Sequence, residues 1–255
     1  MMRSFLCAFA AITLWGAPAA AQEHRVFVNL NYGGLTQKQD LRQTADFSIY
    51  DEPGTWDVNH TIEGGSFFDI GGGFMVMRNV FVGASFTQGT KQTRDVTVNA
   101  SVPSPIFTDT FRAATGSVTG LEHKERAVHL QALWQVPVTV EFGVTLFAGP
   151  TFFTVEDELV SGFSITEAGG DFTSVSLGDI RTEGQKHTTT GFHVGFDAQY
   201  MFMRNVGFMK EAGVGGMVRY SKGSVDLTAP ADTGSGTFKI DTGGPEIGVG
   251  LRFRF

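Results

Sequence analysis

The chain has 255 residues, 24 of them phenylalanine and 33 glycine, with a formal net charge of −7, which argues against nucleic-acid binding. Mean hydropathy is zero, yet beyond the N-terminal segment no run reaches the 18 or more apolar residues of a transmembrane helix. If the chain enters a membrane, its apolar residues must therefore be spread one in two along strands, as in a β-barrel.

Residues 1–21 have the pattern of a secretory signal peptide. A basic residue, a short apolar run and a small-residue cleavage site follow one another, with Ala19 and Ala21 in the cleavage positions. The apolar run is shorter than the roughly 20 residues that span a bilayer as a helix. We therefore expect a mature domain over residues 22–255. Because Cys7, the one cysteine of the chain, falls in the signal, that domain is expected to contain no disulfide.

Eight segments of the expected mature chain alternate between apolar and polar residues, which is the period of a strand with two unlike faces. In the last of them Ile247, Val249 and Leu251 share one face, and Glu246 and Arg252 share the other. Most of the segments are near the 9–11 residues that cross a bilayer at a tilt. The eight predicted strands are residues 25–32, 67–76, 80–88, 126–136, 138–149, 191–200, 211–220 and 246–255.

The predicted connections alternate between short and long. Short ones lie at 77–79, 137 and 203–205, and long ones at 33–66, 89–125, 150–190 and 221–244. Short periplasmic turns and long extracellular loops are the layout of outer-membrane barrels. An even number of strands then places both ends of the domain on the periplasmic side.

Residues 95–102, in the second long connection, alternate as well. They either extend strands above the membrane or add a further hairpin, which would raise the count to ten strands. We expect eight, because Asp109 and Arg112 interrupt the apolar face of the neighbouring segment.

Together these features predict an all-β fold, a closed antiparallel up-and-down transmembrane β-barrel of eight strands. In hydrocarbon every backbone N–H and C=O needs a partner, so the sheet must close on itself. Eight strands leave a lumen just wide enough for side chains to fill, and a buried charge is costly unless it is paired. We expect a paired polar plug, with a gated ion path as the alternative. The predicted lumen network is Asp69, His129, Glu141, His193, Asp197, Glu211, Arg219, Glu246, Arg252 and Arg254.

The C-terminal strand carries a family resemblance. Its residues 248–255 end on an aromatic side chain, with Val249, Leu251, Phe253 and Phe255 at alternate positions. This segment and the eight alternating strands resemble the small bacterial outer-membrane β-barrel proteins, of the outer-membrane protein A and W kind. The resemblance implies insertion into the bacterial outer membrane by the barrel assembly machinery, after periplasmic chaperoning, and contact with membrane lipid and lipopolysaccharide.

No arrangement of residues in the sequence points to a cofactor, a metal or a catalytic centre. The histidines share no ligand spacing, and Ser221 at a predicted rim has no histidine close to it in the sequence. We therefore expect a structural or surface-interaction role in the envelope, with loops that bind a ligand the sequence does not name. A narrow channel for small polar or amphipathic solutes is the alternative, and an enzyme that modifies envelope lipids is a weaker one.

Overall fold

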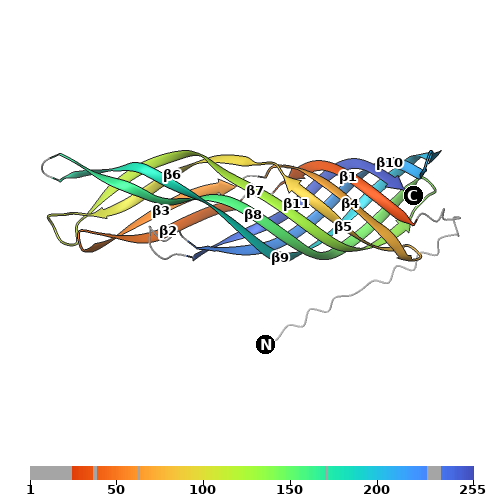
Figure 1. Cartoon of the computed structure of the whole chain (residues 1–255), viewed down its shortest axis with the longest axis horizontal. Coiled ribbons are helices and arrows are strands. Elements are labelled where there is room, and N and C mark those ends of the chain that lie inside the picture. Colours follow the sequence, from red (N-terminus) through yellow and green to blue (C-terminus); the bar gives the residue numbers. More distant parts are fainter. Residues whose placement is uncertain (1–24, 37–38, 63, 170–171, 229–236) are drawn as a thin grey trace, which may run out of the picture.

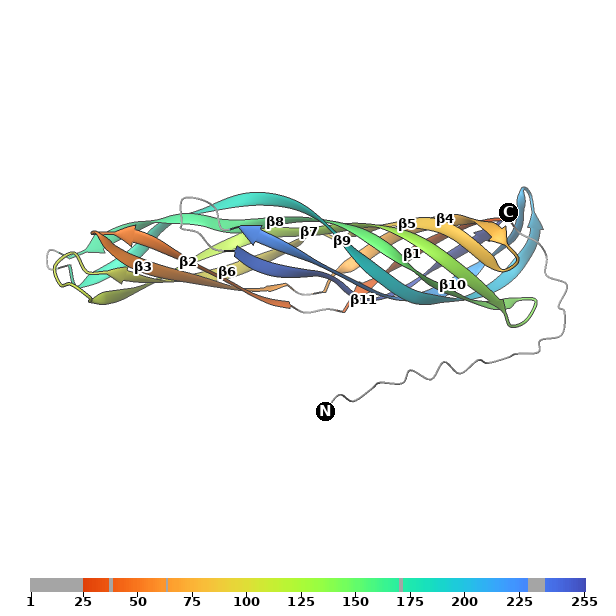
Figure 2. The same cartoon turned by 90° about the horizontal axis from the view of Figure 1, so that it is seen from below.

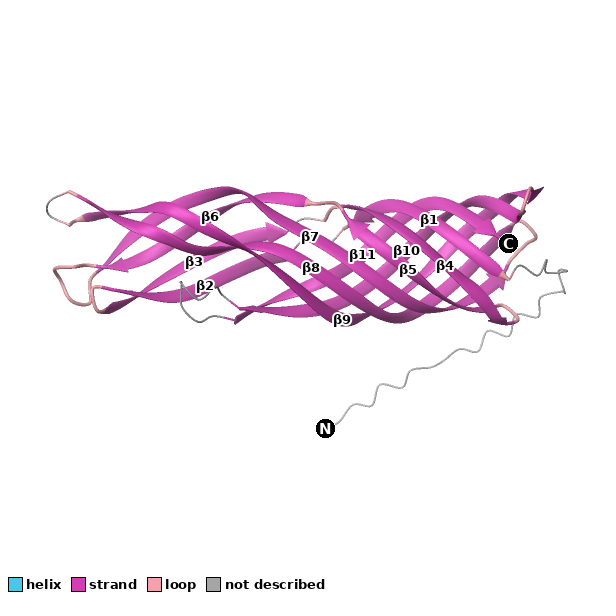
Figure 3. Cartoon of the chain, in the orientation of Figure 1, coloured by secondary structure: helices cyan, strands magenta, loops and turns pink. Residues whose placement is uncertain are grey.

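The structure is a computed structural model that describes residues 25–36, 39–62, 64–169, 172–228 and 237–255. The expected signal peptide, residues 1–21, lies outside the described residues. Within them, no helix is long and apolar enough to cross a membrane. The described chain is built from long strands and the short connections between them (Figure 3).

Eleven strands form one antiparallel sheet. Their bounds are β1 Val26–Leu35, β2 Gln39–Ile49, β3 Glu52–Ile62, β4 Ser66–Met77, β5 Val80–Gly89, β6 Gln92–Pro103, β7 Phe111–Pro137, β8 Phe142–Ala168, β9 Ser174–Val206, β10 Met209–Thr228 and β11 Thr237–Arg254.

Eight of these strands close into a ring, in the order β1-β4-β5-β7-β8-β9-β10-β11 and back to β1. The seam between the first and last strands pairs Leu30 with Leu251 and Tyr32 with Val249. Closure gives each ring strand two partners, which satisfies the backbone groups that hydrocarbon would leave unpaired. The predicted closed barrel of eight antiparallel strands is confirmed.

Two of the predicted short connections are wrong in detail. The strand predicted from residue 138 begins only at Phe142, because residues 138–141 form a turn in which the amides of Val138 and Thr139 donate to the carbonyl of Phe142. The turn predicted at 203–205 lies further on, since β9 continues to Val206 and the chain reverses at Gly207, which has a φ of 62°. Glycine adopts this left-handed conformation without strain.

In the described residues, the segments predicted as long loops are mostly continuations of the sheet beyond the ring. Strands β7 to β11 run on past it, and β2, β3 and β6 join them, so that the molecule is a long rod with the ring at one end (Figures 1 and 2). β6 contains residues 95–102 and pairs with β3 and with residues 111–123 of β7. It lies outside the ring, so the ring keeps eight strands. We call the strands beyond the ring the extension.

The two parts of the rod have opposite polarity. In the ring, large apolar side chains face outward and are exposed, among them Phe74, Leu130 and Phe196, while Asp69 and Arg252 are buried inside. In the extension the apolar side chains are inside, as expected where water surrounds the wall. The buried core of the extension is Ala45, Trp56, Val58, Val96, Val98, Ala100, Val102, Ala114, Leu121 and Val160.

Candidate functional site

The interior of the ring holds a buried ion-pair cluster around Arg219 of β10. Its Nε donates to Glu246 of β11 at 3.0 Å, and its Nη1 donates to Asp69 of β4 at 3.1 Å. The same guanidinium reaches Ser85 at 3.3 Å and Thr87 at 2.6 Å, both on β5. All five side chains are buried. One arginine thus joins β10 and β11 to β4 and β5 across the lumen, and its charge is balanced by carboxylates.

Two further arginines pair on the side of the short turns. Arg252 donates from Nε to both carboxylate oxygens of Asp197, at 3.0 and 3.1 Å. Gly215 makes room for it, because a Cβ at that position would lie 2.6 Å from Arg252 Nε. Arg254 donates to Glu211 at 2.9 Å. These pairs satisfy charges that would be costly to bury alone.

A chain of hydrogen bonds continues from Thr87 to two buried histidines. Thr87 Oγ1 lies 3.1 Å from His129 Nε2, and Thr151 Oγ1 lies 2.9 Å from Nδ1 of both His129 and His193. The two imidazole rings meet edge to face with their centroids 4.9 Å apart. The histidines therefore serve the packed polar network; within the described residues no group of three or more potential ligands is placed to hold a metal ion.

An apolar layer also fills the ring interior, and sequence reasoning missed it. The Phe27 and Phe81 rings pack edge to face at 5.6 Å. A signal was present, since Phe27, Phe67, Phe81 and Phe147 all stand at the alternate positions assigned to the polar face. The layer consists of Phe27, Phe67, Phe81, Leu133, Phe147 and Met217. Beside it, a cavity of only about 20 Å³ lies between Phe27, Asn29, Phe81, Leu133, Gln135, Thr145, Gln199 and Arg254.

The structure brings together most of the predicted lumen network. Nine of its residues lie inside the ring: Asp69, His129, His193, Asp197, Glu211, Arg219, Glu246, Arg252 and Arg254. Glu141 does not, and its placement in the lumen was wrong. It lies exposed in the turn before β8, where Arg204 donates to it at 3.1 Å. The turn at 138–141 takes it off the strand, so the alternation that implied an inward side chain does not apply.

The predicted C-terminal assembly residues lie on the outer wall. Val249 and Leu251 are exposed, while Phe253 and Phe255 are half-buried, and Phe255 stacks on Phe208 of the neighbouring turn at 5.8 Å. Recognition of this segment by assembly machinery stays a prediction.

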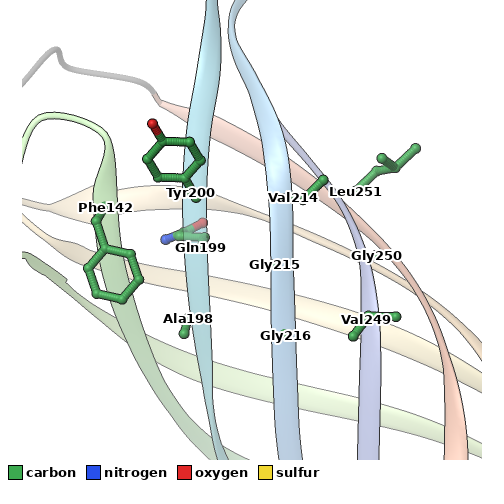
Figure 4. Close-up of a pocket in the computed structure, with 10 residues that line it drawn as sticks. All are labelled: Phe142, Ala198, Gln199, Tyr200, Val214, Gly215, Gly216, Val249, Gly250 and Leu251. Carbon is green, nitrogen blue, oxygen red and sulfur yellow. The ribbon is translucent and has the colours of Figure 1, made fainter.

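A shallow groove of about 500 Å³ runs over this outer wall, across β8 to β11 (Figure 4). It is lined by Phe142, Ala198, Gln199, Tyr200, Val214, Gly215, Gly216, Val249, Gly250 and Leu251. These lining residues include no carboxylate, imidazole or guanidinium. Apart from Gln199 and the hydroxyl of Tyr200, the lining side chains are apolar.

Where the ring meets the extension, four charged side chains form a second cluster. Arg94 pairs with the buried Asp157, while His123 has its Nε2 3.3 Å from Glu125 and its Nδ1 3.6 Å from Asp157. Burial by itself lowers the pKa of His123, but the neighbouring carboxylates of Asp157 and Glu125 outweigh it and raise the pKa to about 9. His123 is therefore a cation at neutral pH.

At the far end of the extension, Arg112 holds three turns together. It pairs with Glu167 at the end of β8 through both terminal nitrogens, and donates to the carbonyls of Pro103 at 2.8 Å and Phe172 at 2.9 Å. Tyr50, from the turn between β2 and β3, donates to the same Glu167 at 2.8 Å. The guanidinium beside Glu167 lowers the pKa of that carboxyl, so the pair is ionised at neutral pH. We call this far end, with its three turns, the tip.

Comparison with known proteins gave one family match and several structural likenesses. A family model described as an outer membrane protein beta-barrel domain matches residues 7–253. No curated protein matches the chain.

Three solved structures of outer-membrane proteins are similar to this chain at low sequence identity. The outer membrane protein OprG from Pseudomonas aeruginosa is 12% identical, with 91% of this chain and 96% of that chain covered and a TM-score of 0.47. The outer membrane protease OmpT from Escherichia coli is 12% identical, with 91% and 97% covered and a TM-score of 0.41. The attachment invasion locus protein Ail of Yersinia pestis is 10% identical, with 90% and 99% covered and a TM-score of 0.33.

Proposed function

The chain belongs to the outer membrane β-barrel protein family, and from that premise we propose that it is a closed, non-conducting barrel that holds a binding platform outside the cell. The family match confirms the resemblance predicted from the sequence. It places the protein in the bacterial outer membrane, and in such barrels the short turns face the periplasm and the longer segments face outward. The extension and its tip are then extracellular.

The filled lumen is the observation that carries the non-conducting role. The Arg219 cluster and the layer around Phe81 and Phe147 both occupy the ring interior. A hydrated ion that crossed this interior would have to separate buried ion pairs and displace packed aromatic rings, and each step is costly.

A rigid extension supports the binding role. Loops on a rigid scaffold are common sites of binding, and here the long connections are themselves sheet with a buried core around Trp56 and Val98. Such a support presents its outermost turns in one fixed arrangement, which lowers the entropy lost when a partner binds.

Conductance in a planar bilayer tests the non-conducting role. We expect purified, folded protein to give no reproducible current steps. A variant with the aromatic layer thinned, Phe81→Ala with Phe147→Ala, serves to show that the assay detects a leak, and Phe86→Ala on the outer wall serves as its matched control. Steady, reproducible steps from the unmodified protein would support the channel alternative and contradict our proposal.

We propose no enzymatic activity for this barrel. At the rim, the buried Ser221 donates to Glu246 at 2.9 Å, so a carboxylate rather than an imidazole engages its hydroxyl. His193, its register partner on β9, directs its Nδ1 to Thr151 instead. Mass spectrometry of envelope lipids from cells with and without the protein tests this point. We expect identical lipid masses, and a new lipid species that depends on the protein would overturn it.

We further propose that the barrel assembly machinery inserts the chain through its terminal strand, after delivery by periplasmic chaperones, and that lipid and lipopolysaccharide cover the outer wall. The exposed Val249 and Leu251 and the aromatic Phe255, at alternate positions of this segment, support this role. Phe255→Ala is expected to lower the yield of folded, heat-modifiable protein in the membrane several-fold. An equal yield would refute the role of that residue, and Phe208→Ala, which removes only its stacking partner, separates recognition from packing.

A further inference from the structure

Among the side chains of the extension whose burial the structure describes, the large exposed apolar ones lie at the tip. They are Tyr50, Ile106, Phe107, Phe111 and Phe172, with Phe107 65% and Ile106 54% accessible. They come from the turns between β2 and β3, β6 and β7, and β8 and β9, which lie together at one end of the rod in both views (Figures 1 and 2). A polar stretch of wall separates them from the apolar belt of the ring. This clustering sets them apart from the single exposed apolar residues found on most surfaces.

The tip is held in a fixed shape. Arg112 joins the three turns through Glu167 and the carbonyls of Pro103 and Phe172. Within the second turn, the backbone amides of Ile106 and Phe107 each donate to the hydroxyl oxygen of the buried Ser104, at 3.3 Å. The two most exposed apolar side chains of the tip, Phe107 and Ile106, thus lie in a turn held by its own hydrogen bonds. A surface ordered before binding loses less entropy on association.

The charge of the tip is negative. Arg112 is the one basic residue in the described turns 50–51, 104–110, 169 and 172–173 and their strand ends, and Glu167 already neutralises it. Asp51 and Asp109 are exposed, and neither forms an ion pair with a described residue of the tip. Both have a left-handed backbone, with φ of 60° and 57°. The apolar side chains are therefore rimmed by carboxylates.

We propose that the tip is a docking surface for a basic amphipathic segment of another protein, one that presents apolar side chains beside lysine or arginine. The apolar residues of the partner would cover Phe107 and its neighbours, and its cations would meet Asp51 and Asp109. A second copy of this tip would bring like charges together, and an anionic lipid surface would be repelled for the same reason. This inference rests on the binding role proposed above and names the chemistry of the partner.

Binding to a defined probe tests the proposal. The full barrel, folded in nanodiscs of zwitterionic lipid, is titrated with a fluorescent amphipathic helix of leucine and lysine, with a glutamate-for-lysine version as the control peptide. We expect the lysine peptide to bind and the glutamate peptide not to. Phe107→Ser is expected to weaken binding at least tenfold, and Phe107→Leu to restore most of it.

Charge is tested with substitutions that keep the turn conformation. Asparagine adopts left-handed φ values as aspartate does, so Asp51→Asn with Asp109→Asn removes charge without straining the backbone. This pair is expected to weaken binding several-fold and to flatten its salt dependence, whereas Asp226→Asn, a change on β10 away from the tip, leaves both unchanged.

Three outcomes would overturn the proposal: equal binding of the two peptides, unchanged affinity in the Phe107 and aspartate variants, or a tip that instead binds protein-free zwitterionic vesicles. None of these outcomes bears on conductance, so they would refute this partner and leave the proposal of a non-conducting barrel intact. Current steps in the bilayer assay would instead remove the proposed function itself.

Discussion

Inside the ring, three guanidinium groups face four carboxylates. Neutral donors also bond to these carboxylates, since Asp69 accepts from Asn31 at 2.8 Å and from Thr87 at 2.9 Å. Hydrogen bonds to a carboxylate stabilise its charged form. The residues concerned are Arg219, Arg252, Arg254, Asp69, Asp197, Glu211 and Glu246.

The hydrogen-bond chain through the two histidines predicts opposite tautomers. The Thr87 hydroxyl donates to Asp69, so His129 must donate from Nε2 and accept on Nδ1. Thr151 then gives its proton to His129, and His193 donates to Thr151 from Nδ1. Nitrogen-15 chemical shifts should show His129 protonated on Nε2 and His193 on Nδ1. The same tautomer for both rings would contradict the chain, and Thr151→Val should remove the constraint on His193.

Removing one partner of a buried ion pair should cost more than removing both. Asp197→Asn leaves Arg252 buried without a counter-charge, and such changes typically cost about 3–5 kcal/mol. The pair Asp197→Leu with Arg252→Met is expected to recover most of that loss. Denaturant midpoints in lipid measure both, with Asp226→Asn on the extension as the control for charge loss. A single variant as stable as the parent would contradict the pairing.

At the scale of elements, the strands of the extension were not predicted from the sequence. Its strands have register shifts, for example between Val160 and Gly162 and between Phe163 and Ile165 of β8. Each shift turns the following residues to the other face, so the period of two that reveals a strand is lost. Ring strands such as β11 keep the alternation of apolar and polar residues, because one face meets hydrocarbon and the other meets the charged interior. These strands were therefore predicted from the sequence.

The core of the extension should depend on Trp56. This side chain is buried on β3 and packs edge to face on Phe163 at 6.0 Å. Truncation of a buried aromatic residue costs about 3–5 kcal/mol. We expect Trp56→Ala to accelerate hydrogen exchange in β3, β6 and the outer part of β8, and to spare the ring. Trp134→Ala, at an exposed site on the ring, is the matched control. Exchange unchanged in the extension would show that no such core exists.

The junction between ring and extension should respond to pH through His123. Because its pKa is raised to about 9 in the folded protein, it contributes stability in full below its ordinary pKa of about 6.5, and that contribution is lost as the pH rises through about 9. Arg94 also faces Asp157. The difference in melting temperature between the parent and His123→Asn should shrink from pH 6 to pH 9.5. A constant difference would contradict the assignment.

At the scale of the whole molecule, one part of the chain is suited to lipid and the next part to water. Lipid requires an apolar exterior for the ring, and water requires an apolar interior for the extension, so the wall reverses its polarity where the strands leave the membrane. Alternation in the sequence predicted the ring, its strand count and the face of nine lumen residues. It did not predict which charges pair, because Arg219 and Asp69 lie 150 residues apart and meet only through closure and strand tilt.

Closure of the ring between its first and last strands is the central claim, and a cysteine pair tests it directly. In a Cys7→Ser background, Tyr32→Cys with Val249→Cys joins register partners of β1 and β11, whose Cα atoms in antiparallel sheets lie about 4.5–5.5 Å apart, within disulfide reach. Tyr32→Cys with Gly216→Cys spans two strand spacings, roughly 10 Å, and is the control. We predict a near-complete disulfide in the first pair and none in the second, in folded protein in the membrane. Failure of the first pair to crosslink, or equal crosslinking of both, would contradict the closed barrel.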